Sequence, residues 1–290
     1  MRSFAEYNPI AVTLYFLFVT GVTMFVSDPV LTAVSFLGAV LFTLMRGGEG
    51  QLKRHIFSLI LFFITALVNP LVSHNGVTVL FFINDNPITL EAVIYGCFNA
   101  LMIVTVLYWF SAFSGIMDSD KLLYIFGAFS PKVALVLSMA LRYIPLFSER
   151  QKRVRSAQTA VGLYKDGNIP DRVRGGVRVF SIMTTWALEK GIVTADSMAA
   201  RAYGQGRRSR FTPFRFYFCD FLLIIISAVA TAVSVWLTAD HKVVFYPALQ
   251  FPSVTVTNLL GYAAYGALVL FPVINDLKEE IRWRYLRSKI

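Results

Sequence analysis

Long apolar stretches, interrupted by few charged residues, dominate the beginning and the end of the chain. A bilayer core about 30 Å thick is spanned by roughly 20 apolar residues in a helix. The pattern therefore predicts an all-α integral membrane protein with about six transmembrane helices. The predicted spans are Pro9–Val26, Pro29–Met45, Ile56–Val72, Ala92–Phe113, Phe216–Leu237 and Val254–Ile274.

The stretch between the fourth and fifth spans has a different pattern. Residues 114–214 hold sixteen Lys and Arg residues against seven Asp and Glu residues, yet they are too apolar for a solvated tail. Ser130-Pro131 is typical of a helix start, and Pro170 opens a second helical pattern. The pattern predicts two long amphipathic helices, Pro131–Gly162 and Pro170–Gly204, at the membrane surface.

Composition supports the membrane assignment, because 56% of the 290 residues are hydrophobic and only 15% are charged. The net charge is +10, and of the 27 basic residues only Lys242 falls in a predicted outer loop. Because basic residues near spans stay on the cytoplasmic side, both termini are expected in the cytoplasm of a multi-pass cell-membrane protein. The predicted segments are 1–113 (four spans), 114–214 (cytoplasmic), 215–275 (two spans) and 276–290 (basic tail).

Chemistry-bearing motifs are sparse. The chain has no Gly-x-x-x-x-Gly-Lys-Ser/Thr loop, so ATP hydrolysis by that route is not expected. His55, His74 and His241 lie in different loops, and no metal site or cofactor is predicted in this chain. Asp220 is expected to pair locally with Arg215. The outer stretch from Val77 to Pro87 predicts a short hairpin.

The end of the second amphipathic helix, Ala199-Ala-Arg-Ala-Tyr-Gly204, places one arginine among small residues before a glycine stop. Small neighbours let a helix end enter a groove, where a guanidinium can hold a carboxylate with two hydrogen bonds. A second interpretation is that Arg201 only meets lipid headgroups. The residues alone leave both open.

Three sequence motifs together resemble a known family. They are Ala140-Leu-Arg-Tyr-Ile-Pro145, Ala157-Gln-Thr-Ala-Val-Gly162, and Ala199-Ala-Arg-Ala-Tyr-Gly204 followed by Arg207-Arg208. The combination is similar to the T component of energy-coupling factor (ECF) transporters. That resemblance implies a scaffold that joins two cytoplasmic ABC-type ATPases, which bind ATP and Mg²⁺, to a small membrane substrate-binding S component for micronutrient uptake.

In that family two long coupling helices each end in an Ala-Arg-small motif that docks into one ATPase. The resemblance makes Ala200, Arg201 and Ala202 the second docking motif. The first is Ala160, Val161 and Gly162, without the family's arginine, so it docks through Val161 or borrows a cation from Arg155 or Arg153. The expected S-component surface is Val133, Leu137, Leu141, Phe180 and Met183.

Two other classes stay open. A basic membrane scaffold that binds anionic lipid or another partner would use dispersed Lys and Arg residues, each of small effect. A membrane-embedded enzyme would need clustered His, Asp or Glu residues, and the sequence offers no such cluster. The preferred interpretation has no nucleic-acid partner and no catalytic residue.

Overall fold

The computed structural model describes residues 4–47, 50–73, 76–83, 86–163, 169–206, 214–239, 241, 243–247, 249–250 and 255–287. The chain divides into two compact units. We call Met1–Leu122 with Phe214–Ile290 the membrane unit, and Leu123–Pro213 the helix-pair unit. The boundary falls inside α5 (Ser119–Phe129), a helix that the sequence pattern did not predict.

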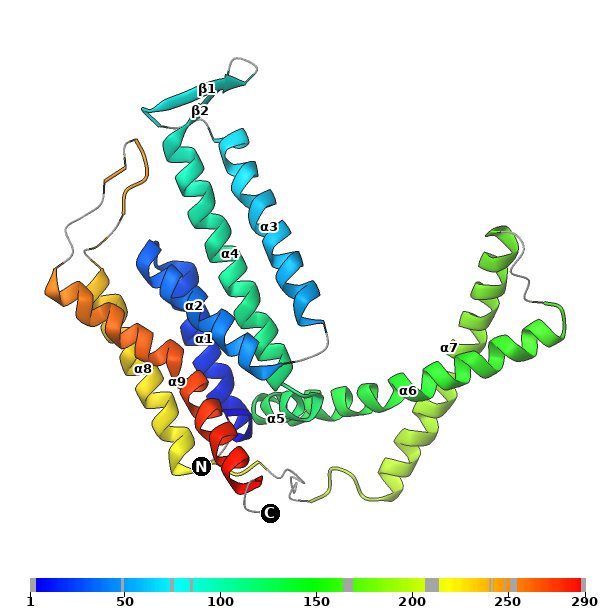
Figure 1. Ribbon diagram of the computed structural model, residues 1–290. Coiled ribbons are helices and arrows are strands. Elements are labelled where there is room, and N and C mark those ends of the chain that lie inside the picture. The colour runs from blue at the N-terminus through cyan, green and yellow to red at the C-terminus, as the bar shows by residue number, and fades with distance from the viewer. Residues whose placement is uncertain are drawn as a thin grey trace. The chain divides into compact units, whose positions relative to one another are not determined.

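The membrane unit contains a helix at each of the six predicted spans (Figure 1). Its elements are η1 (Phe4–Glu6), α1 (Pro9–Phe25), α2 (Pro29–Arg46), α3 (Gln51–Val72), β1 (Val79–Ile83), β2 (Asn86–Thr89), α4 (Leu90–Ile116), α8 (Phe218–Thr238) and α9 (Val256–Arg287). The helical membrane fold and the hairpin are confirmed, and β1 pairs antiparallel with β2. Helix α9 continues well past the predicted end of the sixth span at Ile274.

Six of the described helices are long and apolar enough to cross a membrane: α2, α3, α4, α6 (Pro131–Ala160), α8 and α9. Helix α1 is apolar but has 17 residues. Helix α6 qualifies through its apolar first half, whereas its second half carries a basic run from Arg150 to Arg155. A basic run of this kind is costly in hydrocarbon, so length and composition alone do not decide whether α6 crosses the membrane or lies on its surface.

Helix α1 lies at the centre of the membrane unit, with contacts to α2, α4 and α8. Figure 1 shows α8 and α9 on one side of α1 and α2, and α3 and α4 on the other. Near the first turn of α1 the core is a cluster of aromatic rings in edge-to-face contact: Phe4, Tyr15, Phe16, Phe42 and Trp109. Such pairs add stability beyond their buried area.

A chain of buried hydrogen bonds joins four helices of this unit. The indole nitrogen of Trp109 (α4) donates to Ser35 Oγ (α2) at 2.9 Å. Ser35 Oγ lies 2.9 Å from Thr23 Oγ1 (α1), which lies 3.0 Å from the hydroxyl of Tyr265 (α9). In lipid the hydrophobic effect does little to pull helices together, so interhelical polar contacts help to select neighbours.

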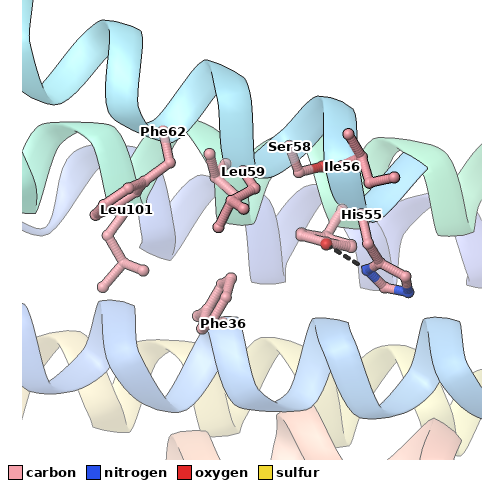
Figure 2. A pocket seen from close by; sticks show the side chains of 9 residues that line it. Phe36, His55, Ile56, Ser58, Leu59, Phe62 and Leu101 are labelled. Atoms are coloured by element: carbon pink, nitrogen blue, oxygen red, sulfur yellow. Dashed lines mark hydrogen bonds between the residues drawn. The ribbon is translucent and has the colours of Figure 1, made fainter. Parts of the chain in front are cut away.

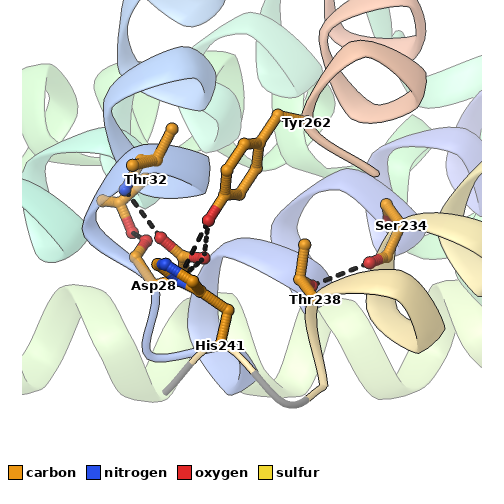
Figure 3. A network of polar contacts seen from close by, with 7 residues as sticks. Asp28, Thr32, Ser234, Thr238, His241 and Tyr262 are labelled. Atoms are coloured by element: carbon orange, nitrogen blue, oxygen red, sulfur yellow. Dashed lines mark hydrogen bonds and ion pairs between the residues drawn. The ribbon is translucent and has the colours of Figure 1, made fainter. Parts of the chain in front are cut away.

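A second polar cluster ties the connection between α1 and α2 to α9 (Figure 3). Asp28 is 1% exposed and caps α2 by accepting from the amide of Val30 at 2.9 Å. Its other oxygen accepts from the Tyr262 hydroxyl at 2.7 Å and lies 3.5 Å from His241 Nδ1. The Asp28 carboxylate thus joins the start of α2, the side of α9 and the segment that follows α8.

The predicted pairing of Asp220 with Arg215 is wrong. Asp220 is buried, and its oxygens accept from the backbone amides of Tyr217 at 2.8 Å and Asn8 at 3.0 Å. The first amides of a helix have no partner within the helix, and their partial positive charge attracts a carboxylate. Asp220 therefore caps α8 and also anchors the residue that precedes α1.

Lys121 of α5 caps the C-terminal end of α4. Its Nζ donates to the carbonyls of Ile116 at 2.8 Å and Ala5 at 2.9 Å. Burial lowers the pKa of this ammonium group, and the nearby Asp118 partly opposes that shift. A sequence reading could not find this contact, because Ala5 is far from α5 along the chain.

Close helix approach depends on glycine at two positions in the membrane unit. A methyl group added at Gly38 of α2 would lie 1.9 Å from Val269 Cγ1 of α9, too close to fit without movement. A methyl group added at Gly96 of α4 would lie 2.8 Å from the carbonyl oxygen of Ala66 in α3, which is also too close. Small residues at such crossings are the usual means of membrane helix packing.

We predict that Gly38→Ala destabilises the protein, because Val269 cannot move away without overpacking the core, at a cost of about 1–3 kcal/mol. Gly21→Ala in α1 is the matched control, since nothing lies within 4 Å of the added methyl group. Thermal unfolding of both purified variants in detergent measures the difference. Equal midpoints would contradict a close crossing of α2 and α9.

Candidate docking site

The helix-pair unit is built from two long helices, α6 (Pro131–Ala160) and α7 (Ile169–Ala200), that cross and contact each other (Figure 1). The Tyr143 hydroxyl lies 2.8 Å from Thr194 Oγ1. The ring of Phe147 meets Trp186 edge-on at 5.3 Å, and the guanidinium of Arg150 lies 5.7 Å from the same ring. These contacts fix the register of α6 against α7.

The second helix of the pair ends in a Schellman motif. The amide of Tyr203 donates to the carbonyl of Met198, and the amide of Ala202 donates to that of Ala199, each at 3.0 Å. This motif needs a left-handed residue at the first position after the cap, and here that residue is Ala202 with φ 56°. Arg201 therefore occupies the cap position, on the exposed end of the helix.

The first helix ends in the same way. The amide of Leu163 donates to the carbonyl of Gln158 at 2.9 Å, and the amide of Gly162 donates to that of Thr159 at 3.0 Å. Gly162 takes the left-handed conformation with φ 75°. The cap position belongs to Val161, whose side chain is 73% exposed.

The two tips therefore correspond residue by residue. Ala160 matches Ala200, Val161 matches Arg201, and Gly162 matches Ala202. All six are exposed. The central residue of each triplet occupies the cap position of a Schellman motif. The side chain at this position is an isopropyl group in the first tip and ends in a guanidinium group in the second.

A cation that the sequence analysis did not name contacts the first tip. Nη1 of Arg178, on α7, donates to the carbonyl of Leu163 at 3.2 Å. Arg153, one of the two arginines expected to replace the missing charge, forms an ion pair with Glu149 one turn earlier. Only the antiparallel register of α6 and α7 brings Arg178 to this tip, and no local motif signals it.

The five residues expected to receive the S component fall into two groups. Phe180 and Met183 line a cavity of about 390 Å³ between α6 and α7, together with Phe147 and Arg155. Val133, Leu137 and Leu141 follow one another at four-residue spacing in the apolar first half of α6 and do not line it. Phe180 and Val133 are 73% and 51% exposed.

The apolar helices of the membrane unit define a multi-pass membrane protein, and the helix-pair unit adds two further long helices. The family described as cobalt transport protein, CbiQ, matches residues 2–213. The chain belongs to this family and is a T component of an ECF transporter.

Two relatives illustrate the similarity. The chain is 32% identical over 108 residues to the energy-coupling factor transporter transmembrane protein EcfT of Listeria innocua, a match that covers 37% of this chain and 41% of the relative. It is 25% identical over 164 residues to EcfT of Thermotoga maritima, covering 54% of this chain and 60% of the relative. Each match thus spans less than two thirds of the relative's own length.

We predict opposite effects of exchanging the left-handed residues of the two tips. Gly162→Ala should speed hydrogen exchange at the Leu163 amide about 5–30-fold, because a left-handed non-glycine residue costs about 1–2 kcal/mol. Ala202→Gly should leave exchange at the Tyr203 amide unchanged or slow it. Mass spectrometry resolved to single amides measures both rates.

Gly176→Ala is the control for the tip variants, since Gly176 lies in α7 with nothing within 4 Å of an added methyl group. It should not speed exchange at either tip. If Gly162→Ala behaved like this control, the left-handed ending of α6 would be wrong.

Proposed function

We propose that this chain is the non-catalytic scaffold of an ECF-type importer, which couples two cytoplasmic ABC-type ATPases to a membrane S component. The observation that carries the proposal is the pair of matching helix tips, each with an exposed central residue between small neighbours. ATP and Mg²⁺ are held by the partner ATPases, and this chain needs no cofactor. The imported solute is a micronutrient chosen by the S component.

Each tip docks into one ATPase through its cap residue. The small side chains of Ala200 and Ala202 let a groove close around Arg201, whose guanidinium can grip a carboxylate through two parallel hydrogen bonds. Val161 offers the matching groove an apolar contact without charge. The two tips therefore suit two different surfaces, and we propose that the two ATPases are unlike each other.

Force passes along stiff helices. ATP-driven closure of the ATPase pair moves the two tips, and the contacts of Tyr143 with Thr194 and of Phe147 with Trp186 make α6 and α7 move together. Coupling of this kind needs a rigid element with two arrangements, and the proposal assigns that role to the helix pair. The S component rests on the two apolar groups, Val133, Leu137 and Leu141 on one side and Phe180 and Met183 on the other.

We predict that Arg201→Ala abolishes uptake and releases one ATPase. Removing one partner of a close interfacial charge pair typically costs about 2–5 kcal/mol. Arg201→Lys should restore uptake only in part, because an ammonium group cannot make the planar double contact. Uptake by cells and recovery of each ATPase on the tagged chain, at matched expression, measure these effects.

Arg174→Ala is the charge-matched control, because Arg174 is an exposed arginine near the start of α7 and far along the helix from the tip. It should leave both readouts near wild type. Val161→Asp should release the other ATPase, since it places a charge in an apolar contact. Equal small losses for Arg201→Ala and Arg174→Ala would favour a diffuse lipid-binding face and reject docking.

The proposal places both termini and the helix-pair unit in the cytoplasm of a bacterial or archaeal cell. A reporter fused after Ile290 or inserted near Gly167 should be cytoplasmic, and one inserted near Asn84 should be external. The physical reason is the retention of basic residues on the inner side of the membrane. A cytoplasmic reporter at Asn84 would overturn the proposed topology.

A further inference from the structure

A cavity of about 460 Å³ in the membrane unit is lined by residues of α2, α3 and α4 (Figure 2). Phe36 of α2 faces Leu59 and Phe62 of α3 across it, and Leu101 belongs to its α4 wall. The volume falls in the range of small-ligand sites, and the lining is largely apolar. The cavity is separate from the docking tips and plays no part in the proposed coupling.

The polar end of this cavity is His55, near the start of α3. Its Nδ1 lies 2.6 Å from the Tyr108 hydroxyl. Its Nε2 is buried and, within the described part of the chain, has no hydrogen-bond partner. A buried polar atom without a hydrogen-bond partner is rare. Its presence here indicates that a bound molecule supplies the missing partner.

The mouth of the cavity lies among exposed apolar residues of α3. Ile56 and Leu59 line it and are nevertheless 49% and 58% exposed. Because α3 is long and apolar enough to cross a membrane, this mouth would open to the acyl-chain region of the bilayer. An apolar chain can therefore enter from the side without crossing water.

Positive charge gathers at the same end as His55. Lys53 is exposed, and Arg54 donates from Nη1 to Ser111 Oγ at 2.9 Å, which holds its guanidinium near the start of α3. Basic residues at this depth attract anionic headgroups. The site thus combines an apolar cavity, a ring nitrogen that can form a hydrogen bond, and cations. An anionic phospholipid has the matching parts in the same order: an acyl chain, ester oxygens and a charged headgroup.

We propose that this cavity binds one anionic phospholipid, with an acyl chain beside Phe36, Leu59 and Phe62. An ester or phosphate oxygen accepts a hydrogen bond from His55 Nε2, and Tyr108 holds the ring by donating to Nδ1. The headgroup charge lies beside Lys53 and Arg54. The bound lipid fills the space between α3 and α2 and so supports α3, which packs mainly against α4.

Native mass spectrometry of the detergent-purified chain, titrated with phosphatidylglycerol, tests the proposal. We expect one tightly bound phosphatidylglycerol per chain and at least tenfold weaker binding of phosphatidylcholine. Leu59→Trp should abolish the tight site by filling the cavity. Leu67→Trp, at another exposed leucine of α3 that does not line the cavity, should bind like wild type.

His55→Phe keeps an aromatic ring but removes the hydrogen bond, and it should weaken phosphatidylglycerol binding at least tenfold. Thermal unfolding without added lipid checks that each variant is folded, and added phosphatidylglycerol should raise the midpoint of the wild type but not that of Leu59→Trp. Unchanged tight binding in Leu59→Trp would overturn the site. Equal binding of phosphatidylcholine, or displacement of phosphatidylglycerol by stoichiometric oleate, would overturn the anionic phospholipid as its occupant.

Discussion

The hydrogen-bond chain from Trp109 through Ser35 and Thr23 to Tyr265 is the interaction on which the membrane unit most depends. Burial of apolar surface cannot choose between helix neighbours in lipid, because lipid tails are as apolar as the side chains. A hydroxyl or indole left unpaired in hydrocarbon is costly, so each link of this chain favours one arrangement of α1, α2, α4 and α9. The close approaches at Gly38 and Gly96 then allow the backbones to meet.

The helix-pair unit follows a different principle. Its helices are long, basic and largely exposed, and they are joined by a few specific contacts rather than by a broad core. The Tyr143–Thr194 and Phe147–Trp186 contacts set the register, and the register brings Arg178 to the carbonyl of Leu163. Such a pair can move as one lever, which is the property that a coupling element requires.

Backbone geometry at the two tips explains how two different side chains, those of Val161 and Arg201, come to occupy equivalent positions. The Schellman ending satisfies carbonyls that would otherwise be left without partners, and it holds the cap residue in one orientation. Ala202 keeps a left-handed conformation that glycine adopts more easily, so the second tip carries a small strain that the first does not. Strain of this kind is often found at functional positions. In an asymmetric assembly, Arg201 and Val161 would then differ in chemistry but not in placement.

The sequence by itself determined the helical membrane class, a helix at each of the six predicted spans, the hairpin and the two long basic helices, because each depends on local composition and length. It also singled out the two triplets at the helix ends. Only the tertiary structure decided the partner of Asp220, the position of Arg178, the polar chain through Ser35 and Thr23, and the cavity beside His55. These depend on which residues distant in sequence meet across packed helices, and a hydrophobic pattern says which face of a helix is apolar but not which neighbour covers it.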